Sequence, residues 1–256
     1  MLGQLYLAQD LYVPPATETA REIASLFNLT LWIAIFVFVV VEGLLLYMII
    51  RFRNNKKVPR EESHRGHTTA EVVWTVIPAA ILLFLGFLSA GTLMRIDTVP
   101  DDTDFTVRVE AFQFGWRFIY PDENGTAYAD EAAWCRAADG GDPTRCSIGE
   151  LRLQENSRVK VHITARDVIH AFAVPEFAIK QDAVPGKPRD AWFETPDLPT
   201  DAPVQYFIQC MEYCGLGHHG MRATLTVFPE GSQPLAYGRA PPPEPSEPTE
   251  TTEPPS

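Results

Sequence analysis

Two long apolar stretches near the N-terminus dominate the hydrophobic pattern of this chain. Residues 29–50 contain one charged residue, Glu42, and residues 72–94 contain none. At a rise of about 1.5 Å per residue, each stretch is long enough to cross the roughly 30 Å hydrocarbon core of a bilayer. The pattern predicts a two-helix transmembrane hairpin. Because a carboxylate is costly in lipid, we expect Glu42 to face a protein partner.

Basic residues are concentrated in the segment 51–71 that joins the two spans. The segment 1–28 contains only Arg21, whereas the joining segment contains Arg51, Arg53, Lys56, Lys57, Arg60 and Arg65. Loops rich in Lys and Arg stay in the cytoplasm. We therefore expect a cytoplasmic loop, with the segment 1–28 and everything after residue 94 on the exterior face.

After the second span the pattern changes to short alternating or β-rich runs, which lie at residues 106–109, 114–120, 158–163, 168–174, 204–208 and 223–228. Turn sequences separate them, including 121–125 and Pro185-Gly186. Short strands at this spacing are typical of a sandwich or a Greek-key barrel. The prediction is a membrane-anchored all-β protein with an exterior domain at residues 95–237.

Charge and composition add two constraints. The chain has a net charge of −12, which argues against a nucleic-acid partner and favours a basic one. Residues 238–256 are rich in proline and glutamate and cannot bury a core, so a disordered tail is expected there.

Metal-ligating residue types gather between Cys210 and Met221, where the sequence reads C-M-E-Y-C-G-L-G-H-H-G-M. About forty residues earlier, Asp167-Val-Ile-His170 adds another imidazole. Thiolate, thioether and imidazole together suit copper, and two thiolates can bridge two copper ions. A structural zinc site built from two cysteines and two histidines, or a disulfide between Cys210 and Cys214, would use the same sulfur atoms.

With its two spans, β-rich exterior and motif C-x-E-x-C-G-x-x-H-x-x-M, the chain resembles subunit II of the haem-copper cytochrome c oxidases over roughly residues 25–230. The resemblance implies a cupredoxin-like Greek-key β-barrel and a dinuclear copper centre called CuA. It implies that both cysteines bridge, that each ion has one histidine, and that the Met thioether and the Glu carbonyl are weak ligands. The implied set is His170, Cys210, Glu212, Cys214, His218 and Met221, whereas His219 lies one residue out of the family spacing.

The same resemblance implies roles outside the copper ligands. The Glu212 side chain would reach a magnesium ion shared with subunit I. Glu71, in Glu71-Val-Val-Trp-Thr-Val-Ile-Pro78, would mark the start of a proton path into subunit I, although a carboxylate that stabilises the helix start is the alternative. Where the family has Q-W-x-W at the point of electron arrival, this chain has Gln113-Phe-Gly-Trp116. Phe114 and Trp116 are therefore the candidate contacts for the donor, which is a cytochrome c or a small copper protein.

Cys135 and Cys146 lie in an acidic insertion that the family pattern does not require. The exterior compartment favours disulfides, so we expect these two cysteines to pair.

The resemblance leads to one functional expectation and one rival. The chain would be the electron-input subunit of a proton-translocating terminal oxidase in the cell membrane of a prokaryote, with dioxygen reduced in the haem-bearing subunit I. The rival is a stand-alone, membrane-anchored copper-binding or copper-delivery protein. The two-span hairpin, with Glu42 inside its apolar run, and the Glu71 segment argue against the rival, because delivery needs only one anchor. An acidic exterior fits both donor docking and a salty medium.

Overall fold

A computed structural model of the protein describes residues 13–53, 66–120 and 146–231. The chain divides into two compact units: a helical unit at residues 18–98, and a β unit formed by the preceding residues together with everything from residue 99 onward. The expected tail at 238–256 and the expected turn at 121–125 lie outside the described residues.

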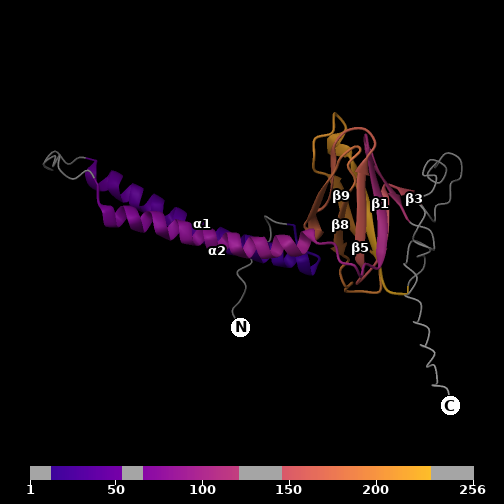
Figure 1. The fold of residues 1–256 in the computed structure, drawn as a ribbon, viewed down its shortest axis with the longest axis horizontal. Helices are drawn as coiled ribbons and strands as arrows, with labels where there is room; N and C mark the ends of the chain where they lie inside the picture. Colours follow the sequence, from indigo (N-terminus) through magenta and orange to yellow (C-terminus); the bar gives the residue numbers. More distant parts are fainter. Residues whose placement is uncertain (1–12, 54–65, 121–145, 232–256) are drawn as a thin grey trace, which may run out of the picture. The chain divides into compact units, whose positions relative to one another are not determined.

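The helical unit is a pair of long helices, α1 (Glu18–Phe52) and α2 (Thr68–Asp97), which run side by side (Figure 1). Both are long and apolar enough to span a membrane, and their apolar windows are not buried within the protein. Each helix is longer than the apolar run from which it was predicted, because polar residues on both sides of the run are also helical. An ion pair joins Glu22 of α1 to Arg95 of α2.

The β unit consists of two sheets of five strands each within the described residues. One sheet has the order β3-β2-β1-β5-β8 and the other β4-β10-β9-β6-β7. The first contains β1 (Phe105–Phe112), β2 (Gly115–Ile119), β3 (Cys146–Ile148), β5 (Arg158–Ala165) and β8 (Arg189–Glu194). The second contains β4 (Glu150–Gln154), β6 (His170–Val174), β7 (Ile179–Ala183), β9 (Val204–Cys210) and β10 (Arg222–Phe228).

Strands such as β4 and β5 alternate in burial, β6 is buried throughout, and the two sheets bury their apolar faces against each other. Val107, Val109, Trp116, Leu151 and Leu225 are all at most 1% exposed. Neighbouring strands are antiparallel except for β1 with β5 and β4 with β10, which are parallel. Parallel neighbours require crossovers, so the topology is more complex than a simple meander. This arrangement is a cupredoxin-like β-sandwich, which confirms the expected fold class.

Of the ten strands in the part of the chain that the structure describes, the sequence pattern predicted six and missed four. The six predicted runs correspond to β1, β2, β5, β6, β9 and β10. The turn at Pro185-Gly186 is confirmed by the bridge between Val184 and Lys187 and by the positive φ of Gly186. Of the missed strands, β3 is only three residues long, and charged and polar residues weaken the alternation of β7 and β8. The remaining strand, β4, alternates regularly as E-L-R-L-Q and could have been identified.

Candidate metal centre

The ligand-rich segment is closed by the pairing of two strands. β9 ends at Cys210 and β10 begins at Arg222, and these strands are antiparallel neighbours. The Cys210 N–H donates to the Met221 carbonyl at 3.1 Å. The first and last sulfur atoms of the motif therefore lie opposite each other, although eleven positions separate them in the sequence.

A second strand pairing adds the distant histidine. In the antiparallel pair β6 and β9, Phe172 lies opposite Cys210, and the Met211 N–H donates to the Ala171 carbonyl at 3.1 Å. His170, the first residue of β6, is fully buried next to the end of β9. The sheet register thus brings together residues forty positions apart.

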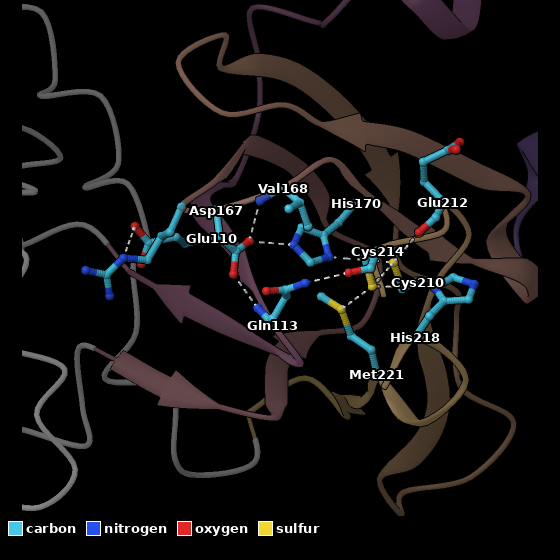
Figure 2. Close-up of polar contacts among 11 residues, drawn as sticks. Glu110, Gln113, Asp167, Val168, His170, Cys210, Glu212, Cys214, His218 and Met221 are labelled. Carbon is cyan, nitrogen blue, oxygen red and sulfur yellow. Dashed lines mark hydrogen bonds and ion pairs between the residues drawn. The ribbon is translucent and has the colours of Figure 1, made fainter. Parts of the chain in front are cut away.

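The donor atoms of these residues converge on one small region (Figure 2). Cys210 Sγ lies 3.2 Å from the Glu212 carbonyl oxygen and 3.9 Å from His170 Nδ1. Cys214 Sγ lies 3.6 Å from His218 Nδ1 and 3.7 Å from Met221 Sδ. The two cysteine sulfurs are 3.9 Å apart. Each thiol therefore has one imidazole and one weaker donor next to it.

The sulfur separation decides against a disulfide here. A disulfide bond is about 2.05 Å long, and both cysteines are free and buried. The disulfide alternative for Cys210 and Cys214 is wrong for this structure. Burial, together with the neighbouring Cys210, raises the pKa of Cys214 to about 11. Without a metal ion the thiol is therefore protonated, and metal binding must displace its proton.

The positions of the two histidines bear on the number of metal ions. His170, Cys210 and Cys214 place their ligand atoms within 4.8 Å of one another, in a group that does not include His218. A single tetrahedral zinc ion would hold all four donor atoms within roughly 4 Å of one another. Figure 2 shows the imidazoles of His170 and His218 on opposite sides of the two sulfurs. The donor set therefore fits a copper site better than a single tetrahedral zinc ion, whereas His219 is exposed and makes no such contact among the described residues.

The backbone carbonyl and the side-chain carboxylate of Glu212 point in different directions. Its carbonyl faces Cys210, while its carboxylate points away from the sulfurs (Figure 2). Glu212 also lines an open pocket of about 700 Å³, together with Val168, Ile169, Asp182, Tyr213, Cys214 and Gly215. Lys180 Nζ is 2.8 Å from Asp182 Oδ1. This hydrogen bond, with a further contribution from the Glu212 carboxylate, raises the pKa of Lys180.

The two candidate donor-contact residues lie in different places. Trp116 is 0% exposed and packs edge-on against His170, with ring centroids 6.3 Å apart. Trp116 therefore presents no exposed edge to a donor, because its position in β2 points into the core. Phe114 is 43% exposed. Its ring packs on the ligand loop so closely that a Cβ at Gly217 would lie 2.5 Å from the ring.

Asp167 and Gln113 also belong to this site, although the sequence motif gave them no role. Asp167 Oδ1 lies 2.8 Å from His170 Nε2. Burial alone would raise the pKa of Asp167, but hydrogen bonds from His170 and from the Gln113 and Val168 N–H groups lower it below its ordinary value. A carboxylate three residues before a metal-ligating histidine is the sequence signal that could have identified Asp167.

The two membrane-segment glutamates are not part of this centre. Glu42 lies within α1. Glu71 is in the first turn of α2, where its carboxylate accepts from the His67 N–H at 3.2 Å. The His67 ring in turn accepts from the Ala70 N–H. Glu71 therefore stabilises the start of α2, as the helix-start alternative expects.

Of the two cysteines in the predicted disulfide, Cys135 and Cys146, Cys146 alone lies within the described residues. Cys146 begins β3 and is disulfide-bonded. Cys135 lies outside the described residues, so the pairing itself stays a prediction.

The fold and the site define a membrane protein with two transmembrane helices and a cupredoxin-like domain that carries a candidate copper site. Residues 7–91 match the family described as cytochrome c oxidase subunit II, transmembrane domain. Residues 105–227 match its periplasmic domain. The chain therefore belongs to the cytochrome c oxidase subunit II family, and it is a subunit of that respiratory-chain enzyme with a periplasmic β domain.

Two relatives agree with this assignment by sequence. A protein named probable cytochrome c oxidase subunit 2 in Rickettsia felis is 34% identical over 222 residues, which cover 86% of this chain and 68% of that one. Cytochrome c oxidase subunit 2 of Cereibacter sphaeroides is 32% identical over 240 residues, which cover 86% and 76%. The crystal structure of the periplasmic domain of subunit II of cytochrome oxidase of Bradyrhizobium japonicum is 29% identical, with a TM-score of 0.39, and covers 52% of this chain and 89% of that one.

Proposed function

We propose that this chain is the electron-input subunit of its oxidase, with a dinuclear CuA centre in the β-sandwich. Its ligands are the side chains of His170, Cys210, Cys214, His218 and Met221 and the carbonyl of Glu212. When bound, the copper pair accepts and releases one electron at a time. The chain's own residues hold the donor atoms in place and keep water away from them.

The observation that carries this proposal is the arrangement around the two thiols. The sulfurs are 3.9 Å apart and unbonded, and each has an imidazole nitrogen within 3.9 Å. Met221 is fully buried, and its sulfur faces Cys214, which a zinc site would not require. Cys210 and His170 are held by hydrogen-bonded strands. A rigid, buried donor set of this kind limits the structural change on electron transfer, which favours rapid transfer.

The donor docks on the exterior face next to the ligand loop. Phe114 is an exposed aromatic residue that contacts this loop, so it brings the donor close to Cys214 and His218 by packing, with no redox role of its own. Trp116 is buried and packs against the imidazole of His170, so it supports the site from within the core. The net charge of −12 favours a basic cytochrome c or copper protein. Donor binding should therefore weaken as salt rises, and a rate that stays flat with salt would favour adaptation to a salty medium.

The proposed electron-input function also requires contacts with subunit I. Glu212 lines the open pocket, and its carboxylate would bind a magnesium ion shared with subunit I, while Asp182 is already paired with Lys180. Electrons leave on this side for the haem of subunit I, where oxygen is reduced to water and protons are translocated. Glu71 marks the start of a proton path on the opposite, cytoplasmic side. Membership of an oxidase complex follows from the family and argues against a stand-alone copper-delivery protein.

The deciding experiment measures copper in the full-length chain in detergent. We expect two copper ions per chain and one unpaired electron shared equally between them, measured by metal analysis and electron paramagnetic resonance. His218→Ala should lose this signal, while the neighbouring His219→Ala should keep it. One copper ion per chain, or preferential binding of colourless zinc, would contradict the proposal.

A further inference from the structure

The carboxylate of Asp167 lies on the side of His170 that faces away from the sulfurs (Figure 2). Asp167 Oδ1 is 2.8 Å from His170 Nε2, while His170 Nδ1 is 3.9 Å from Cys210 Sγ. A carboxylate only accepts hydrogen bonds, so Nε2 carries the ring proton. This tautomer leaves the lone pair of Nδ1 free on the side of the thiol, where a metal ion would bind.

The second oxygen of Asp167 reaches the other half of the site. Asp167 Oδ2 accepts from the Gln113 N–H at 2.7 Å. The side-chain amide of Gln113 donates to the Cys214 carbonyl, also at 2.7 Å. Gln113 lies between β1 and β2, so this short path connects three segments that are far apart in the sequence.

Asp167 is itself held firmly. Its Oδ1 also accepts from the Val168 N–H at 2.7 Å, so both carboxylate oxygens are fixed by backbone donors. On the other side, His170 is fully buried under Trp116. A rotation of the carboxylate or of the imidazole would break at least one of these contacts.

We propose that Asp167 is a positioning residue that orients ligands on both sides of the metal centre, at His170 and at Cys214. Through His170 Nε2 it selects the tautomer that presents Nδ1, and through Gln113 it fixes the segment of Cys214. This inference rests on the proposed copper centre, and it assigns a role to two residues that lie outside the ligand motif.

The test uses Asp167→Asn in the full-length chain. An amide has one oxygen, so it cannot accept from both His170 Nε2 and the Gln113 N–H. We expect copper affinity, measured by competition with a chelator, to fall about 10- to 100-fold. Because the change acts first on His170, the unpaired electron should also become unequally shared. A merely structural role would not produce this spectroscopic change.

Asp190→Asn is the matched control. Asp190 Oδ1 lies 2.7 Å from His162 Nδ1 on β8 and β5, so it forms a similar acid–imidazole pair outside the ligand set. It should change neither copper affinity nor electron sharing. An equal loss in Asp190→Asn, or an affinity of Asp167→Asn within about twofold of the unmodified chain, would overturn the inference.

If Asp167→Asn does not fold, Gln113→Met provides a second test of the inference. Methionine fills a similar volume but cannot donate to the Cys214 carbonyl, and it leaves the backbone N–H in place. We expect a smaller loss of copper affinity, with the His170 tautomer unchanged in nitrogen NMR spectra of the copper-free protein. Unchanged affinity in Gln113→Met would overturn the coupling to Cys214. If instead the unmodified chain fails to bind two copper ions, the proposed function fails first.

Discussion

The helical hairpin and the β-sandwich place their apolar residues in opposite ways. In α2 no residue is buried, and in α1 only Ala20 is. In the sandwich, large apolar side chains such as Phe118, Phe172 and Ile208 are fully buried. Both regions are rich in apolar residues, yet only the sandwich has a core of its own.

The difference follows from where each region satisfies its backbone hydrogen bonds. A helix satisfies them internally, so it can expose apolar side chains to lipid or to a partner subunit. Strands pair with one another, and they need two facing sheets to bury their apolar side. Strand register then places particular residues next to each other. The metal centre therefore lies in the sandwich, and the hairpin serves to anchor the chain and to contact the rest of the oxidase.

The largest expected effect is the loss of the copper centre from the sandwich, with no change in the helical hairpin. Cys214→Ser in the sandwich should abolish the dinuclear copper centre, because one thiolate cannot bridge two ions in the same way. The hairpin should be unaffected, and its helices should keep their helical circular dichroism. Metal analysis and electron paramagnetic resonance measure the first effect. Retention of two equivalent copper ions would mean that Cys214 is not a bridging ligand.

A matched pair of leucines tests the comparison through stability. Leu151 in β4 is 0% exposed, whereas Leu83 in α2 is 76% exposed. Leu151→Ala should lower the free energy of unfolding of the sandwich by about 2–5 kcal/mol. Leu83→Ala should change it by less than about 0.5 kcal/mol. Denaturant unfolding followed by tryptophan fluorescence measures both, and similar losses would show that the two regions unfold as one.

The ligand loop offers a second matched pair, at glycines. A Cβ at Gly217 would lie 2.5 Å from Cγ and Cδ2 of Phe114, whereas a Cβ at Gly220 meets nothing within 4 Å. Gly217→Ala should therefore destabilise the copper-free sandwich by about 1–3 kcal/mol and weaken copper binding. Gly220→Ala should have a much smaller effect in the same thermal unfolding measurements. If both glycines tolerate alanine equally, Phe114 does not pack firmly on this loop.

Glu71→Gln tests whether the hairpin does more than anchor the chain. Glutamine can still accept from the His67 N–H, so the start of α2 keeps its cap, while the ionisable group is lost. If Glu71 takes part in proton uptake, oxygen reduction by the assembled oxidase should slow severalfold while copper reduction by the donor is unchanged. Stopped-flow measurements separate these two steps. Full turnover in the variant would leave Glu71 with the capping role alone.

The smallest expected effect is a pH dependence confined to the sandwich. A hydrogen bond from Arg152, with a further one from Thr226, lowers the pKa of Glu150 below its ordinary value of 4.5. Since the folded-state pKa is lower than the unfolded one, this contribution to stability is present above pH 4.5 and is lost as the pH falls through the folded-state pKa. Glu150→Gln should therefore flatten the acid side of the stability profile. An unchanged acid slope would remove Glu150 from the groups that cause it.

The local pattern of the sequence determined several features of this protein. The hairpin was predictable because two runs of more than twenty residues with at most one charge are long enough to span a bilayer as helices. Strong alternation in runs such as 158–163 identified a core strand, and the residue types between Cys210 and Met221 identified a metal site. These inferences depend on side-chain chemistry and on near neighbours, which the sequence contains directly.

Only the tertiary structure decided which distant residues meet. The register of β6 against β9 places His170 beside Cys210, and the turn at Gln113 connects Asp167 with Cys214. In the other sheet, the pairing of β2 with β1 places Trp116 in the core, whereas Phe114 lies at the surface. Polar strands such as β7 and β8 form because their neighbours supply backbone partners, which their own sequence does not indicate. Pairing across a sheet is a long-range choice, and it depends on the packing of the whole sandwich.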